Sequence, residues 1–184
     1  GAGPGGLSFA AFAARAGHKV SIYEKSSALG GQFNEAARIP GKEVYLETVR
    51  YYRELIKKHN VDIYLNSPVR SSEDLKEAPE VLVWAAGVKP RIPDITGIDD
   101  PVVCTYRQIL RGEVAPGKKI AIIGGGGIGT DVAHFLYHQE GEDFYDFWGI
   151  DQTLSSEGGL KTPVREIPDI ALTVFMRSKG KLGG

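Results

Sequence analysis

Two glycine-rich turns are the stretches of this chain whose residue types and spacing predict chemistry. Residues 1–6, Gly-Ala-Gly-Pro-Gly-Gly, have the form G-x-G-x-x-G, and a variant returns at 124–129. In such turns the first glycine permits a tight bend, the second lets the backbone approach a pyrophosphate, and the third lets a helix pack closely. The helix N-terminus then offers N–H groups and partial positive charge to the phosphates. One such motif is weak evidence, but two predict two nucleotide sites in one chain.

An acidic residue accompanies the first turn at the distance expected for ribose binding. Residues 4–17 have a helical pattern, residues 18–23 alternate toward a strand, and Glu24 follows at the strand's end. Glu24 lies 18 residues after Gly6, near the roughly 20 residues at which an acid binds ribose hydroxyls. A carboxylate accepts hydroxyl hydrogen bonds and repels a 2′-phosphate, so the spacing favours FAD or NAD. The alternative is an ordinary solvated strand end.

The second turn differs at the corresponding place. A strand is expected ahead of it at 119–123, and the next core strand at 170–176 ends on Arg177 instead of an acid. Arginine can pair bidentately with a 2′-phosphate, which favours NADP, although a generic surface base is the alternative. The 48 residues from Gly129 to Arg177 exceed the usual spacing and predict an insertion at about 140–167.

The remaining pattern predicts an α/β fold with two Rossmann-like dinucleotide-binding lobes, both incomplete in this chain. An amphipathic helix is expected at 43–59, and strands at 61–65 and, buried, at 81–85. A proline-containing connector with a short helix near 106–111 leads to the second lobe. We place the lobes at 1–112 and 113–184. Because no strand precedes the first turn, we expect it to be less well formed than the second.

Composition excludes several classes of protein. The chain has 184 residues, 22 basic and 23 acidic, for a formal net charge of −1. That balance argues against nucleic-acid and membrane-surface binding, and no apolar run could span a bilayer. Cys104 is the single cysteine, so neither a disulfide framework nor an iron–sulfur cluster is expected in the chain. A cytoplasmic setting is the simplest interpretation. His134 and His138 have metal-like spacing but lack a third ligand, so no metal site is assigned.

Three further stretches resemble a known family. Leu-Gly-Gly at 29–31 and the continuation through 42, Gly-Gln-Phe-Asn-Glu-Ala-Ala-Arg-Ile-Pro-Gly-Lys, resemble the FAD-binding region of NADPH-dependent 2,4-dienoyl-CoA reductases and their relatives among enoate reductases and trimethylamine dehydrogenase. Residues 85–91 resemble the A-T-G-x-x-P-R turn of the same flavoproteins, with Ala86 in place of threonine. The stretch 147–160 resembles the same group.

The resemblance implies a module that passes a hydride from NADPH on the second lobe to FAD on the first. It further implies reduction of 2,4-dienoyl-CoA in fatty acid β-oxidation, with FMN, a [4Fe–4S] cluster, the acyl-CoA site and the acid/base residues in a preceding barrel. No catalytic residue is therefore assigned to this chain. A backbone contact of Val69 with adenine is also implied. The expected cofactor-binding residues are Gly1, Gly3, Pro4, Gly6, Glu24, Gly31, Gln32, Val69, Ala86 and Gly87 for FAD, and Gly124, Gly126, Gly127, Ile128, Gly129 and Arg177 for NADPH.

Three alternatives remain open at this point. The chain could be the electron-input part of another flavoprotein, such as a glutamate synthase small-subunit relative. It could belong to the trimethylamine dehydrogenase type, in which the module binds only ADP, although Arg177 argues against this. It could also be a nucleotide-binding fragment without catalytic activity. The sequence does not indicate an oligomeric state.

Overall fold

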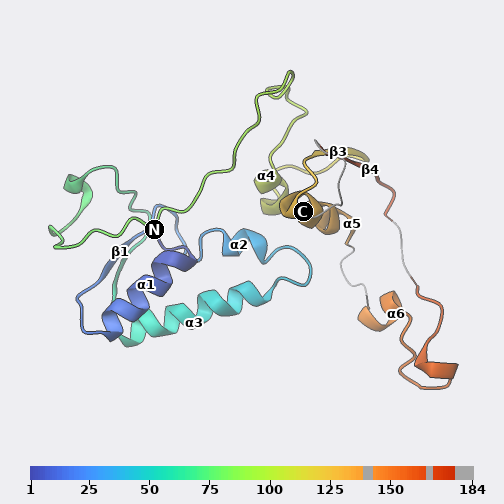
Figure 1. Ribbon diagram of the computed structural model, residues 1–184, viewed down its shortest axis with the longest axis horizontal. Helices are drawn as coiled ribbons and strands as arrows, with labels where there is room; N and C mark the ends of the chain where they lie inside the picture. Colours follow the sequence, from blue (N-terminus) through green and yellow to red (C-terminus); the bar gives the residue numbers. More distant parts are fainter. Residues whose placement is uncertain (139–142, 165–167, 177–184) are drawn as a thin grey trace. The chain divides into compact units, whose positions relative to one another are not determined.

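The computed structural model describes residues 1–138, 143–164 and 168–176. The chain divides into two compact units, Gly1–Val103 and Cys104–Gly184, and each contains one of the two glycine turns (Figure 1). No helix in the described ranges is both long and apolar enough to cross a membrane.

The first unit contains two short parallel strands and the helices that cover them. Its elements are α1 (Pro4–Arg15), β1 (Ser21–Tyr23), α2 (Phe33–Ala36), α3 (Val44–Lys58), β2 (Asp62–Tyr64) and the 3-10 helix η1 (Ser72–Asp74). β1 pairs with β2 so that Ser21 lies opposite Asp62 and Tyr23 opposite Tyr64. α1 and α3 lie side by side (Figure 1). The helices and strands predicted at 4–17, 18–23, 43–59 and 61–65 are all present, with shorter bounds.

The core of this unit follows from the apolar faces of its two long helices. α1 turns small residues inward, which permits close packing, and ends before Gly17, whose φ of 95° suits a helix stop. α3 buries a stripe with helical spacing and exposes its charged side. Nine buried residues form the cluster: Ala2, Leu7, Ala10, Ala11, Ile22, Leu29, Val49, Ile56 and Val61. Ala2, within the glycine turn, therefore belongs to the core.

The prediction of a buried strand at 81–85 is wrong. This stretch forms no strand, and Val81 and Trp84 are 75% and 74% exposed. An apolar strand in a parallel sheet becomes buried only when neighbouring strands accept its backbone hydrogen bonds and helices cover both faces. In the part of the chain described, β1 and β2 pair only with one another, so the stretch remains extended and unpaired.

The second unit has the order of strand, glycine turn, helix and parallel strand. Its elements are α4 (Tyr106–Arg111), β3 (Lys119–Ile123), α5 (Gly127–Tyr137), α6 (Phe144–Trp148), the 3-10 helix η2 (Glu157–Gly159) and β4 (Ala171–Phe175). β3 pairs with β4, Lys119 opposite Ala171 and Ile123 opposite Phe175. The helix predicted at 106–111 and the strand at 119–123 are confirmed with those bounds, and β4 confirms the strand predicted at 170–176.

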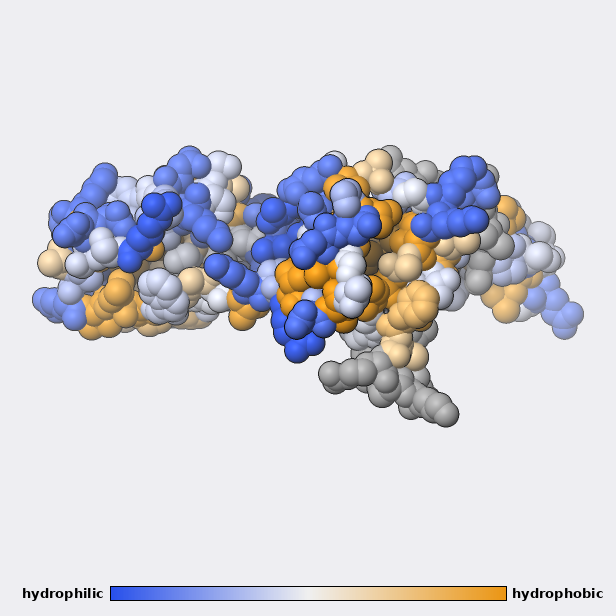
Figure 2. Space-filling view, turned by 90° about the horizontal axis from the view of Figure 1, so that it is seen from above, coloured by the Kyte–Doolittle hydropathy of each residue, from blue (hydrophilic) through white to orange (hydrophobic). Residues whose placement is uncertain are grey.

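Fewer side chains are buried in the second unit than in the first. Its buried apolar residues within the described ranges are Ile109, Leu110 and Val132. Ile123 and Phe175, at the paired ends of β3 and β4, are 64% and 57% exposed. Figure 2 shows apolar side chains open on the surface of the molecule. A two-stranded ladder has little sheet area to cover, so its helix shields only part of the apolar surface.

The insertion predicted at about 140–167 contains its own local structure in the residues described. Asp143 caps α6 by accepting the N–H groups of Tyr145 and Asp146, each at 2.9 Å. Beyond α6, an antiparallel bridge joins Ile150 to Leu160. Between them the Asp151 carboxylate, in a residue only 6% exposed, accepts hydrogen bonds from Thr153, Ser155 and Ser156. These donors hold the pKa of Asp151 well below its usual range.

Candidate functional site

The first glycine turn leads directly into the N-terminus of α1. Gly3 is the residue before the helix, with φ −73° and ψ 178°, and its carbonyl oxygen accepts the Leu7 N–H at 2.9 Å. Pro4 takes the first helical position, where no donor is needed. The N–H groups of Gly5 and Gly6 precede the helical ladder, so they are available to an acceptor outside the helix. This arrangement is the one that binds phosphate at a helix end.

The glycines of this turn divide into those required by packing and those that leave room. A Cβ atom on Gly6 would overlap the carbonyl oxygen of Gly1. A Cβ on Gly3 or Gly5 would meet no atom within 4 Å. The third glycine of the motif is therefore needed for the close approach of helix and turn. Gly3 and Gly5 leave open space beside the N–H groups at the start of the helix, which is where phosphate groups bind at helix ends.

Two later segments that contain predicted cofactor-binding residues lie beside this turn. The Gly30 N–H donates to the Ala2 carbonyl oxygen at 2.8 Å, and a Cβ on Gly31 would lie 2.9 Å from the Gly3 Cα. The backbone of Ala86 is also near the turn, since a Cβ on Gly1 would lie 3.5 Å from the Ala86 Cα. The predicted residues Gly1, Gly3, Gly31 and Ala86 are thus brought together.

Three other predicted residues lie near this group of backbone segments. The Gln32 side-chain amide donates to the carbonyl oxygen of Val88 at 3.0 Å, next to Gly87, whose φ is 71°. Val69 lies two residues beyond Ser67, whose N–H donates to the Glu24 carbonyl oxygen at 2.8 Å. Gln32 and Gly87 therefore border the turn on one side, and Val69 follows the strand end that carries Glu24.

Glu24 is held against the glycine turn by its own carboxylate. The Glu24 N–H donates to the Tyr64 carbonyl oxygen at 2.9 Å, which extends the β1–β2 pairing by one residue. Its Oε2 accepts the Ala2 N–H at 2.7 Å, and its Oε1 accepts both the N–H of Ser26, at 2.9 Å, and the Ser26 hydroxyl. Glu24 is 6% exposed. Sequence reasoning found Glu24 but missed Ser26, for which a polar residue two positions after a carboxylate is the available signal.

Hydrogen bonding decides the charge state of Glu24. Burial, the largest single influence, raises the pKa of its carboxyl group, but the hydrogen bonds from Ser26 and Ala2 act together in the opposite direction. The result is a pKa below the ordinary value of 4.5. Glu24 is therefore a carboxylate at neutral pH, in the state that accepts hydroxyl groups and repels a second anion.

The second turn begins its helix in the same way as the first. Gly126 precedes α5 with φ −77° and ψ −174°, and a Cβ on Gly129 would overlap the carbonyl oxygen of Gly124. Gly126 and Gly127 have open space around them, and Ile128 is 55% exposed. The Gly124 N–H donates to the Phe175 carbonyl oxygen at 2.9 Å, which joins the turn to the end of β4. Arg177 lies outside the described residues.

The expectation that the second turn is the better formed differs from the structure. Both turns present the same helix start and the same close approach of the third glycine. The first is the more firmly anchored, because Ala2 is fully buried and hydrogen-bonded to Glu24 and Gly30. Burial and these two hydrogen bonds fix the backbone of the first turn.

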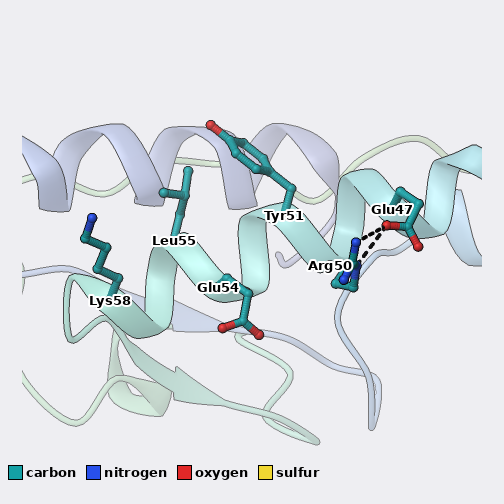
Figure 3. Close-up of a pocket in the computed structure, with 6 residues that line it drawn as sticks. All are labelled: Glu47, Arg50, Tyr51, Glu54, Leu55 and Lys58. Atoms are coloured by element: carbon teal, nitrogen blue, oxygen red, sulfur yellow. Dashed lines mark hydrogen bonds and ion pairs between the residues drawn. The ribbon is translucent and has the colours of Figure 1, made fainter.

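Two other features, a hollow on α3 and a pair of histidines at the C-terminal end of α5, lie outside the predicted cofactor-binding residues. A hollow on α3 contains none of the predicted site residues; it is lined by Glu47, Arg50, Tyr51, Glu54, Leu55 and Lys58. Tyr51 and Leu55 point to one side of the helix, and Glu54 points to the other (Figure 3). The rings of His134 and His138 are 6.3 Å apart. Within the described ranges no group of three His, Cys, Asp or Glu side chains could hold a metal ion.

Parallel strands joined through a glycine turn and a helix N-terminus define the dinucleotide-binding class of α/β proteins. Residues 1–145 match the family described as pyridine nucleotide-disulphide oxidoreductase, and the chain belongs to this family. Its members bind FAD and NAD(P)H. The single cysteine, Cys104, leaves no disulfide to be formed within this chain.

Proteins similar to this chain include several reductases. A solved structure of 2-naphthoyl-CoA reductase with 2-naphthoyl-CoA is 40% identical, with a TM-score of 0.70, over 74% of this chain and 21% of that one. Cinnamate reductase of Clostridium sporogenes is 36% identical over 141 residues, 76% of this chain and 21% of the relative. Bilirubin reductase of Mediterraneibacter gnavus is 34% identical over 136 residues, which are 74% of this chain and 21% of the relative. The chain thus spans about a fifth of the length of these relatives.

Replacing Gly6 by alanine tests the packing of the first turn, with Gly5→Ala as the matched control. The Gly6→Ala methyl group would overlap the Gly1 carbonyl oxygen, so we expect a loss of about 1–3 kcal/mol in the free energy of unfolding. At Gly5 the added methyl group meets open space, and alanine in a helix should be neutral or up to about 1 kcal/mol stabilising. Chemical denaturation measures both. Equal stability of the two variants would show that the turn is not packed as described.

Replacing Glu24 by glutamine tests the carboxylate network. Glutamine has one acceptor oxygen for three donors, so we expect a loss of about 1–3 kcal/mol in the free energy of unfolding at pH 7. Because the folded-state pKa of Glu24 is lowered, its stabilisation is complete above the unfolded value near 4.5 and is lost as the pH falls through the folded value. The difference between wild type and Glu24→Gln should therefore shrink between pH 5 and pH 3.

Urea denaturation at several pH values measures this difference. Glu54→Gln, which changes an exposed carboxylate on α3, is the control and should stay within about 0.5 kcal/mol of wild type. A gap between wild type and Glu24→Gln that stays constant down to pH 3 would contradict the assignment.

Proposed function

We propose that the chain binds FAD at the turn of residues 1–6 and NADPH at the turn of residues 124–129, as the electron-input module of a reductase. The observation that carries the proposal is that both turns have the same open helix end, and that an acid, Glu24, is hydrogen-bonded to the first. Both turns offer the N–H groups and the free space that a pyrophosphate needs. The family match supports FAD and a nicotinamide dinucleotide as the cofactors.

In this proposal the residues of the chain bind and orient the two cofactors. At the first site the helix end receives the pyrophosphate, and the Glu24 carboxylate accepts a ribose hydroxyl. At the second site the N-terminus of α5 receives the pyrophosphate, and Arg177 pairs with the 2′-phosphate, which supports NADPH over NADH. When bound, the two cofactors supply hydride transfer from the nicotinamide to the flavin, which is their own chemistry.

The substrate class follows from the relatives and from the sequence resemblance. A reductase named for naphthoyl-CoA and another named for cinnamate support an acceptor with a conjugated, electron-poor double bond. Within that class we propose a 2,4-dienoyl-CoA, as in fatty acid β-oxidation, reduced in the cytoplasm. Electrons would leave this chain for a [4Fe–4S] cluster and FMN in a separate barrel that also binds the acyl-CoA, so no catalytic residue is assigned here.

Anaerobic titration with NADPH tests the electron-input role. FAD-loaded protein should lose its flavin absorbance near 450 nm on addition of about one equivalent of NADPH, because the second site delivers hydride to the first. Dithionite, added to a parallel sample, shows that the bound flavin can be reduced. Bleaching by dithionite but by neither NADPH nor NADH would instead favour a module that binds nucleotide without catalysis, as in the ADP-binding alternative.

Replacing Arg177 by alanine tests the choice of nucleotide. Loss of a charge-assisted bidentate pair should raise the dissociation constant for NADPH about tenfold to a hundredfold, whereas that for NADH should be nearly unchanged. Isothermal titration measures both constants, and Lys179→Ala is the control for a general loss of positive charge. An equal effect of Arg177→Ala on the two nucleotides, or no effect on either, would count against the 2′-phosphate contact.

A further inference from the structure

The Glu24 carboxylate is largely engaged by the chain itself. A carboxylate can accept about four hydrogen bonds, and three donors already occupy it, two from Ser26 on Oε1 and the Ala2 N–H on Oε2. One acceptor position of the carboxylate, on Oε2, therefore remains for a ribose hydroxyl. An acid whose only task was to bind ribose would not need these contacts, so they indicate a second task.

That second task concerns the peptide group between Gly1 and Ala2. Its N–H donates to Glu24 Oε2 at 2.7 Å. In a trans peptide the N–H and C=O groups point in opposite directions, so the same bond turns the Gly1 carbonyl oxygen away from Glu24. That oxygen faces Gly6, where a Cβ atom would overlap it. Glu24 thus sets the contact by which the turn is joined to the start of α1.

The next peptide group, between Ala2 and Gly3, is fixed from the other side. The Ala2 carbonyl oxygen accepts the Gly30 N–H at 2.8 Å. Because the peptide is trans, the Gly3 N–H points away from the Gly30 N–H that holds the Ala2 carbonyl, and a Cβ on Gly3 would meet no atom within 4 Å. The two peptide groups on either side of Ala2 are thus held by one bond each, and Ala2 is fully buried. Without Glu24 its N–H would be a buried donor without a partner.

We propose that Glu24 is a positioning residue of the phosphate cradle, oriented for this role by Ser26, and that this role is separate from any contact with ribose. Ser26 holds Oε1 with its N–H and its hydroxyl, which turns Oε2 toward Ala2. Loss of either side chain frees the Gly1–Ala2 peptide to rotate and weakens the binding of the pyrophosphate itself. The inference rests on the proposed nucleotide site at residues 1–6.

Ligands that differ in their ribose hydroxyls separate the two roles of Glu24. We would titrate ADP, 2′,3′-dideoxy-ADP and inorganic pyrophosphate into wild type, Glu24→Gln, Ser26→Ala and the control Glu54→Gln. We expect Glu24→Gln to weaken all three ligands by a similar factor, about tenfold, and Ser26→Ala to weaken all three by about threefold. Glu54→Gln should bind all three as wild type does. Isothermal titration gives the dissociation constants.

Three results would overturn the inference. The first is a loss confined to ADP, with dideoxy-ADP and pyrophosphate binding unchanged, since Glu24 would then act on ribose alone. The second is a lower melting temperature with unchanged affinity for dideoxy-ADP, which would make the network purely structural. The third is a wild type that binds none of the ligands, which would remove the proposed nucleotide site as well. If Glu24→Gln does not fold, the same comparison is decided by Ser26→Ala, which keeps the carboxylate and the Ser26 N–H.

Discussion

A hydrogen bond between a buried carboxylate and one backbone N–H group determines the arrangement of the first unit. Glu24 accepts the Ala2 N–H, and so joins the end of β1 to a turn that lies 22 residues earlier. Ala2, Leu7 and Ile22 are members of one buried cluster, so the bond lies at the edge of the core. Because an unpaired donor or an unpaired charge would be costly at this depth, each partner requires the other. The helix start, the Gly30–Gly31 segment and the end of β1 all meet at this point.

The two units share a turn geometry but differ in how they hold it. In the first unit side-chain hydrogen bonds and a buried cluster surround the turn. In the second the described contact is a backbone hydrogen bond from Gly124 to the end of β4, and the neighbouring apolar residues Ile123, Ile128 and Phe175 are largely exposed. The same glycine spacing is therefore compatible with two quite different surroundings. What the motif specifies is the approach of helix to turn, which depends on the absence of a Cβ at Gly6 and Gly129.

Local sequence patterns predicted the helices and most strands. They could not predict which strands pair with one another, because pairing depends on residues far apart in the sequence. The amphipathic pattern at 43–59 predicts α3, and the helical pattern at 4–17 predicts α1, because both signals lie within a few residues of one another along the chain. The apolar run at 81–85 has strand composition, yet whether it pairs depends on neighbours that composition cannot specify. At the site, the spacing of Glu24 was predictable. Its orientation toward Ala2 depends on Ser26 and on the β1–β2 register, which no motif encodes.

The loop after α6 has a consequence for folding. The hydrogen bonds to the Asp151 carboxylate come from residues at most five positions away, and the Ile150–Leu160 bridge spans ten. Contacts of such short range need little loop-closure entropy and form early relative to long-range strand pairing. The β3–β4 ladder, by contrast, joins segments about 50 residues apart. A loop that folds on its own between those strands leaves fewer residues to be ordered when the strands pair. A long insertion therefore slows the pairing of β3 with β4 less than its length implies.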